Sequence, residues 1–212
     1  MTGNPELEFN IVQQPYPIYN VFIEREEAAK AFDYTFMTAI SLALIPCVMV
    51  QFILNEREYK LKHQQLLSGM SLAGYWVSNL IFDILMAYVP ILLIVILTFA
   101  FGKNYEGTWV LYLLFPPAIV PFTYVTSFAF KSDINAQIMT LFIHFSAGCL
   151  GTAIVFTLQQ IPIAMHWGDS LRWFFTIIPS FCVTHGILWS ASGQLVLDSR
   201  SEDVSPEGVP IP

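Results

Sequence analysis

ILMAYVPILLIVILTFAF, residues 84–101, is the stretch that decides the fold, because eighteen consecutive residues carry no charge. An α-helix of that length covers about 27 Å at 1.5 Å per residue, close to the roughly 30 Å of hydrocarbon in a bilayer. Other long apolar runs occupy residues 36–54, 109–130 and 134–158. The sequence therefore predicts an all-α, polytopic membrane protein: a bundle of four transmembrane helices over about residues 34–54, 72–101, 109–130 and 134–158.

The composition of the whole chain favours the same environment. Hydrophobic residues make up 55% and charged residues only 12%, whereas about a quarter of a soluble domain is charged. The net charge of -7 comes largely from the two polar ends, and no basic patch predicts a nucleic-acid partner. Cys47, Cys149 and Cys182 lie in apolar stretches without a CxxC pair, so we expect buried thiols rather than a metal site or a disulfide.

A fifth apolar stretch, residues 169–191, differs from the others because it contains Arg172, Pro179 and His185. Pro179 lacks a backbone donor and divides the stretch into halves too short to cross a bilayer. We interpret the stretch as a re-entrant helical hairpin, with a kinked full span as the alternative. A hairpin at membrane depth needs protein or a water-filled cavity around its broken backbone, which implies partner helices.

The polar segments set the expected orientation. Residues 1–33 are expected to form an extracytoplasmic tail and a charged lead-in helix, and residues 192–212 a truncated polar loop. The connection 55–71 carries several cations, which favours the cytosolic side. The margin is thin, because four cations fall on that side against three on the other.

The same connection has the composition of a short helix. Glu56 and Lys60, like Glu58 and Lys62, are spaced i,i+4 and support helix formation by a few tenths of a kcal/mol per pair. Ser68-Gly69 provides a stop. The spacing predicts a rigid helix over Glu56–Ser68 that projects from the membrane; the alternative is a solvated amphipathic loop on the membrane surface.

A residue pattern in this region has a known counterpart. The chain reads NEREYKLKHQQLLSGM over residues 55–70, then Tyr75-Trp76, Asn79 and Asp83. This resembles the second membrane half of the A-subfamily ABC transporters, which reads E-R-x-x-K-x-K-H-x-Q-x-x-S-G and then Y-W-x-x-N-x-x-x-D. The resemblance extends more loosely through residues 128–131 and 178–182, and covers roughly residues 34–191.

The resemblance implies a function for residues 34–191, the transmembrane domain of an ATP-driven exporter of lipids or similar amphiphiles. Its expected partners are a nucleotide-binding domain, the other transmembrane half and membrane lipids. The chain has no GxxxxGK[ST] loop, so no cofactor is expected here, and ATP and Mg²⁺ are expected at a nucleotide-binding domain missing from this truncated chain. The chain is then not an enzyme by itself. The alternatives are a passive channel or membrane scaffold, and a membrane enzyme, whose candidate residues are predicted at different depths.

Two sets of candidate residues follow. In an ABC transporter, a cytosolic lever must pass nucleotide events to the membrane helices, and the expected coupling residues are Glu56, Arg57, Lys60, Lys62, His63, Gln65, Ser68 and Gly69. Beyond the lever, Tyr75, Asn79 and Asp83 are spaced i, i+4, i+8 and form one polar stripe on the next helix. Together with Trp76 they are expected to form a polar network at the inner mouth.

A third set lies deeper in the membrane. His144 is expected near the membrane middle, on a face shared with Gly148, Gly151 and Thr152, whose small side chains permit close helix packing. We interpret His144 as the donor or acceptor of an interhelical hydrogen bond, with a substrate or proton site as the alternative.

The run 109–130 contains Pro116, Pro117 and Pro121. They are expected either to break the helix and expose carbonyls to a translocation path, or only to kink it.

Overall fold

A computed structural model describes the backbone of residues 18–101 and 107–202, and the side chains of residues 28–101 and 107–193. The described residues are helical and contain no strand. The elements, in chain order, are α1 (Ile18–Glu58), α2 (Leu61–Leu67), α3 (Leu72–Ala100), α4 (Thr108–Ser127), α5 (Asp133–Phe145), the π-helix η1 (Ser146–Gly151), α6 (Thr152–Gln160), α7 (Met165–Phe175) and α8 (Pro179–Glu202).

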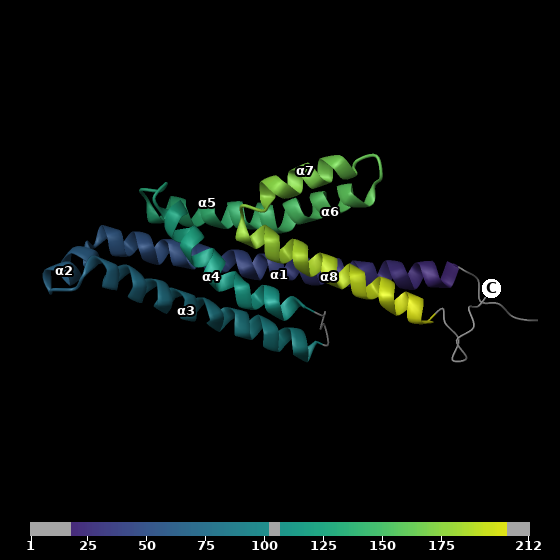
Figure 1. The fold of residues 1–212 in the computed structure, drawn as a ribbon, viewed down its shortest axis with the longest axis horizontal. Coiled ribbons are helices and arrows are strands. Elements are labelled where there is room, and N and C mark those ends of the chain that lie inside the picture. The colour runs from purple at the N-terminus through teal and green to yellow at the C-terminus, as the bar shows by residue number, and fades with distance from the viewer. Residues whose placement is uncertain (1–17, 102–106, 203–212) are drawn as a thin grey trace, which may run out of the picture.

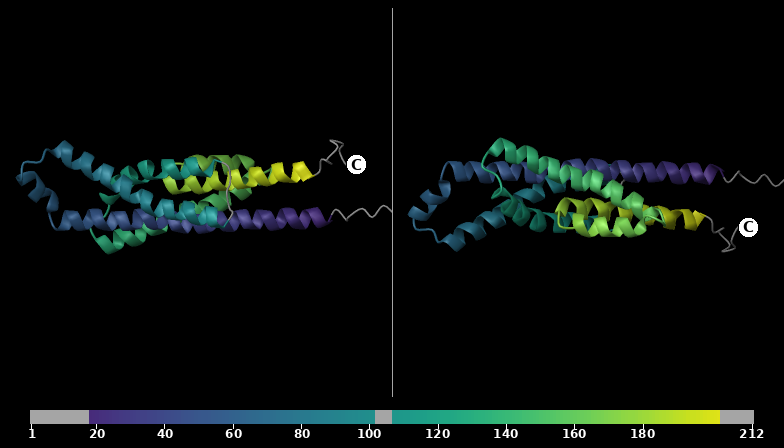
Figure 2. Two further views of the ribbon diagram at one scale, coloured as in Figure 1. Left: turned by 90° about the horizontal axis from the view of Figure 1, so that it is seen from below. Right: turned by 90° about the horizontal axis from the view of Figure 1, so that it is seen from above.

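The long helices lie side by side along one axis (Figure 1). Helix α2 closes one end of the bundle by joining α1 to α3, and we call this the α2 end (Figure 2). Within the described residues, four segments are long and apolar enough to cross a membrane: Ala28–Glu58, Leu72–Ala100, Thr108–Ser127 and Asp133–Gln160. The predicted all-α bundle with four membrane helices is confirmed.

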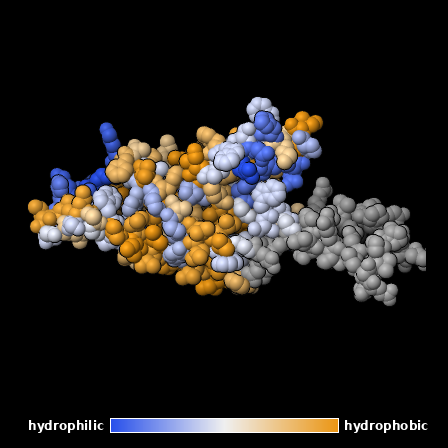
Figure 3. All heavy atoms as spheres, in the orientation of Figure 1, coloured by the Kyte–Doolittle hydropathy of each residue, from blue (hydrophilic) through white to orange (hydrophobic). Residues whose placement is uncertain are grey.

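The hydrophobic core forms where α1, α3, α4 and α8 meet. Its fully buried members include Leu42, Phe115, Ile119 and Ile187. Helix α3 lies at the edge, since only 11% of its most apolar window is buried. Hydrophobic residues cover the middle of the surface, whereas hydrophilic ones gather at the α2 end and over α7 (Figure 3). The exposed apolar belt suits contact with lipid acyl chains or with other membrane helices.

The expected break in α4 is wrong, because the helix runs without interruption through Pro116, Pro117 and Pro121. Pro117 leaves the carbonyl of Leu113 without its usual i+4 donor. The hydroxyl of Tyr88 on α3 donates a hydrogen bond to that carbonyl at 2.7 Å. A side chain from the neighbouring helix thus replaces the lost backbone donor, which is how membrane helices tolerate proline.

The single rigid helix expected over Glu56–Ser68 is also wrong. Helix α1 continues to Glu58, and the chain turns at Lys60, whose φ of 55° is left-handed, before α2 begins at Leu61. The i,i+4 pairs proposed to stabilise that helix therefore span a turn. The segment is helical in two pieces, and the second has seven residues.

The expected hairpin over residues 169–191 corresponds to α7 and α8, which run in opposite directions (Figure 1). The reversal lies at residues 176–178, so Pro179 does not split a helix but is the first residue of α8. Proline is favoured there because the first N–H groups of a helix have no intrahelical acceptor.

Residues 192–202, expected to belong to a polar loop, continue α8. Of the expected tail and lead-in helix, residues 18–33 begin α1, and residues 1–17 lie outside the described residues.

Replacement of Tyr88 by Phe removes the donor that compensates for Pro117. We expect Y88F to lower the unfolding free energy by about 1 kcal/mol, as for one unmade interhelical hydrogen bond. In a P117A background, residue 117 regains its N–H, so the Y88F loss should shrink. Unfolding of the four proteins in mixed micelles measures this coupling; equal losses in both backgrounds would contradict the proposed compensation.

Gly168 permits the close approach of α7 to α6. A Cβ there would lie 2.9 Å from Cγ and 3.1 Å from the backbone N of Gln159. We expect G168A to destabilise the protein by about 1–3 kcal/mol through overpacking. Gly193 on α8 is a matched control, since no described atom lies within 4 Å of the Cβ it would gain. G193A should leave the melting temperature unchanged or slightly raised, and an equal fall in both variants would refute the packing argument.

Candidate functional site

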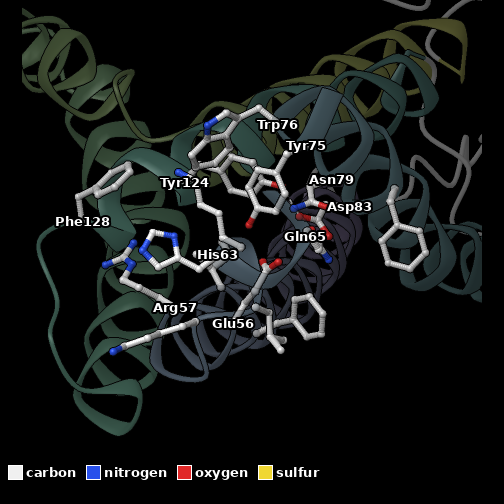
Figure 4. Close-up of a pocket in the computed structure, with 16 residues that line it drawn as sticks. Glu56, Arg57, His63, Gln65, Tyr75, Trp76, Asn79, Asp83, Tyr124 and Phe128 are labelled. Atoms are coloured by element: carbon white, nitrogen blue, oxygen red, sulfur yellow. Dashed lines mark hydrogen bonds between the residues drawn. The ribbon is translucent and has the colours of Figure 1, made fainter. Parts of the chain in front are cut away.

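A pocket of about 500 Å³ opens at the α2 end, between the end of α1, α2, α3 and the end of α4 (Figure 4). It brings together two sets of residues that the sequence placed on different elements. Six expected coupling residues line it: Glu56, Arg57, Lys60, Lys62, His63 and Gln65. All four residues of the expected inner-mouth network line it as well: Tyr75, Trp76, Asn79 and Asp83. Ser68 and Gly69 lie outside its lining, at the end of α2.

Arg57 fastens the end of α1 to the end of α4. Its guanidinium donates to the backbone carbonyl of Ser127 at 3.3 Å and to the Ser127 hydroxyl at 3.1 Å. The same group lies 4.9 Å from the ring centroid of Phe128. A cation at the last carbonyls of α4 is favourable for the helix dipole, and the planar guanidinium can donate and stack at once.

Lys62 fastens α2 to α3. Its ammonium lies 4.9 Å from the ring centroid of Trp76 and 5.7 Å from that of Tyr75. Both distances fall within the range of cation–π attraction, which is worth about 0.5–1 kcal/mol at an exposed site. Helix α2 has no buried residue, so this contact is a substantial part of what positions it.

Asp83 links α3 to α4, because it accepts a hydrogen bond from the hydroxyl of Tyr124. The Tyr124 ring also contacts the Trp76 ring, with centroids 5.9 Å apart. Sequence reasoning missed Tyr124 as a partner. One signal was present: Asp83 and Tyr124 lie about equally far from the turn between α3 and α4, so an antiparallel pair brings them to the same depth.

These contacts join α1, α2, α3 and α4 into one unit at the α2 end. The arrangement has no nucleophile paired with a base. No group of three or more His, Cys, Asp or Glu side chains in the described part of the chain could hold a metal ion. The geometry suits mechanical coupling between the connection and the membrane helices, because a displacement of α2 acts directly on α3, and α3 contacts α4.

His144 lies in a buried seam between the α5–η1–α6 rod and α8. Its Nδ1 is 2.8 Å from the hydroxyl of Ser180. Further along the same seam, the hydroxyls of Thr152 and Thr184 lie 2.8 Å apart and form a second hydrogen bond. All four side chains are at most 2% exposed. A polar pair shielded from water in this way holds two helices in register.

The small residues of this seam set the helix separation. A Cβ on Gly148 would contact Thr184 at 3.6 Å, whereas one on Gly151 would contact the Phe175 ring at 3.4 Å. The two glycines therefore face different neighbours, α8 and the end of α7. Both belong to η1, the π-helical segment, and such segments often occur at functional positions.

Sequence reasoning did not identify Ser180 and Thr184 as the partners of His144 and Thr152. Their spacing of four residues was the available signal, because it places two hydroxyls on one face of α8. That signal is weak, since hydroxyls in membrane helices also bond to their own backbone, as the Thr184 hydroxyl does to the Ser180 carbonyl.

Comparison with known proteins gives one family and a set of relatives. Residues 4–198 match a family described as ABC-2 family transporter protein. The human retinal-specific phospholipid-transporting ATPase ABCA4 is 29% identical over 168 residues, which cover 74% of this chain and 7% of that protein. The rat phospholipid-transporting ATPase ABCA3 is 26% identical over 191 residues, covering 84% of this chain and 11% of that protein. The chain thus spans about a tenth of the length of these curated relatives.

Removal of the Ser180 hydroxyl tests how much the His144–Ser180 hydrogen bond stabilises the protein. We expect S180A to cost about 1 kcal/mol of unfolding free energy, because His144 is left buried without its partner. S192A is the control, since the Ser192 hydroxyl bonds only to the backbone of its own helix, at Trp189. In a double-mutant cycle with H144F, the S180A loss should largely disappear; additive losses would show that the two side chains do not interact.

Proposed function

The chain belongs to the ABC-2 family of transporter membrane proteins, and we propose that it forms the transmembrane domain of an ATP-driven exporter. It is an integral, multi-pass membrane protein, and the part of the chain that the structure describes has four helices suited to crossing the bilayer. The proposed cargo is a lipid or a similar amphiphile. Two relatives, which are both named phospholipid-transporting ATPases, support that choice of cargo.

The observation that carries the proposal is the pair of contacts that hold α2 and its neighbouring helix ends together. Arg57 joins the end of α1 to α4, and Lys62 joins α2 to α3. A partner that moves α2 would therefore move the membrane helices with it. Leu67 of α2 is 88% exposed and offers an apolar contact to such a partner, which we propose to be a nucleotide-binding domain on the cytosolic side.

The residues of this chain suggest which part of the transporter binds nucleotide and which part forms the transport path. We propose that ATP and Mg²⁺ bind at the nucleotide-binding domain, because this chain contains no phosphate-binding loop motif. The membrane domain contributes the path and the mechanical response. The apolar face of α3 is mostly left uncovered by the rest of the described chain. The second transmembrane half of the transporter is its proposed neighbour.

The buried seam has a separate role in the proposal. His144 and Thr152 are satisfied by Ser180 and Thr184, so we assign them, with Gly148 and Gly151, to helix packing rather than to the transport path. The seam anchors α8, whose first residue is Pro179, against the α5–η1–α6 rod.

The coupling role is tested in the transporter that carries this domain, reconstituted in liposomes with a fluorescent phospholipid. R57A and K62A should each lower lipid-stimulated ATP hydrolysis and ATP-dependent lipid translocation several-fold. K62A releases α2 from α3, whereas R57A releases the end of α1, from which the chain enters α2, from α4. K131A is the matched control: Lys131 lies at the same end of the bundle but does not line the pocket. Unchanged lipid-stimulated hydrolysis in both variants would refute the lever, and translocation that proceeds equally without ATP would indicate a passive channel.

A further inference from the structure

The pocket at the α2 end has two chemically different walls. Arg57 and His63 lie on one side beside Phe128, whereas Asn79 and Asp83 lie on the other, with the Glu56 carboxylate directed toward Tyr75 between them (Figure 4). Basic side chains and carboxylates that line one cavity without pairing directly are suited to a ligand that carries both charges.

The cationic wall has groups available for a ligand. Arg57 is engaged with Ser127 and Phe128. Within the described part of the chain, the side chains of Lys60 and His63 make no hydrogen bond or ion pair, and both residues are exposed and line the pocket. An ammonium group and an imidazole at the membrane boundary are suitable donors to a phosphate oxygen.

The opposite wall suits an amine. The rings of Tyr75 and Trp76 lie 5.4 Å apart and those of Trp76 and Tyr124 lie 5.9 Å apart, beside Asp83. Aromatic clusters of this kind bind quaternary and primary ammonium groups through their π faces. The Lys62 ammonium already lies over two of these rings, which demonstrates that their faces accept a cation in this geometry.

The surroundings of the pocket favour a lipid over a soluble phosphate compound. Phe52, Phe82 and Phe128 line it and are 60%, 51% and 67% exposed. The exposed apolar face of α3 continues from Phe82 along the helix through Leu85. A ligand with its headgroup in the pocket would thus find an apolar surface for its acyl chains.

We propose that this pocket binds the headgroup of a zwitterionic phospholipid, with the phosphate toward Lys60 and His63 and the amine toward Glu56, Asp83 and the aromatic rings. The bound amine replaces the Lys62 ammonium on Trp76, and Lys62 then turns toward the phosphate. Because Lys62 holds α2 against α3, lipid occupancy alters the attachment of α2. The site goes beyond the proposed function, since the bound lipid need not be the lipid that is moved.

The experiment measures lipid bound by the purified 212-residue chain in detergent, using native mass spectrometry. Phosphatidylcholine, phosphatidylglycerol and diacylglycerol with identical acyl chains are compared. Phosphatidylcholine should bind most tightly, because phosphatidylglycerol lacks the amine and diacylglycerol lacks both charges. K60Q/H63Q should weaken phosphatidylcholine binding about tenfold through the loss of two partly exposed charge-assisted contacts, and E56Q should reduce the preference over phosphatidylglycerol.

Matched controls are K131Q and E58Q, which make the same chemical changes at the same end of the bundle outside the pocket. They should bind phosphatidylcholine like the unaltered chain. Equal binding of the three lipids, or equal effects of pocket and control variants, would overturn the proposal. Displacement of the lipid by glycerophosphocholine at equal concentration would also overturn it, because the headgroup alone would then be the ligand.

A second measurement does not depend on the behaviour of the chain in detergent. In native membranes, a phosphatidylcholine with a photoreactive headgroup should label residues 52–83, and K60Q/H63Q should reduce that labelling about tenfold. Labelling confined to other segments would refute the site. Either result is independent of ATP-dependent translocation, so loss of the site and loss of the proposed transport function are distinguished.

Discussion

Hydrocarbon offers no hydrogen-bond partner to a polypeptide, and this constraint governs the structure. Each backbone group at membrane depth must find its partner inside the protein. The backbone hydrogen bonds inside the long helices meet most of this requirement. Where α4 cannot, because Pro117 lacks an N–H, Tyr88 supplies a donor from α3. Where the chain reverses between α7 and α8, the turn lies beside the core formed by Ala147, Val155 and Phe181. Each of these two irregular features thus has a neighbouring helix beside it.

The α2 end is where this constraint relaxes, and polar side chains concentrate there. Arg57, Lys62 and Asp83 each connect different elements, and each uses a different interaction: hydrogen bonds to a helix end, attraction to aromatic faces, and a hydroxyl-to-carboxylate bond. At a water-exposed surface each contact is individually weak. Together they restrain a seven-residue helix that has no buried residue of its own, and they leave it movable by a partner.

The sequence predicts the spans well, because long uncharged runs have few alternative structures. It predicts breaks poorly. Proline rules left a break in α4 open beside a kink, because the compensating hydroxyl belongs to another helix and a local sequence pattern does not reveal it. The i,i+4 pairs indicated one helix through Lys60, but a left-handed turn occurs there, since α1 and α3 must be joined. In the site, most lining residues were predicted from a motif, whereas Tyr124 and Ser180 depend on which helices face each other, and spacing alone does not determine that.

The π-helical segment η1 can also be considered as a change of phase. Each residue of an α-helix advances the side-chain direction by about 100°, so a wider turn shifts every later residue around the axis relative to an uninterrupted helix. The segment η1 lies between His144, which contacts Ser180, and Thr152, which contacts Thr184. A return of η1 to regular α-helix would rotate α6 and the attached α7 against α8. The segment η1 thus sets the rotation of α6 about the rod axis, far along the chain from α2.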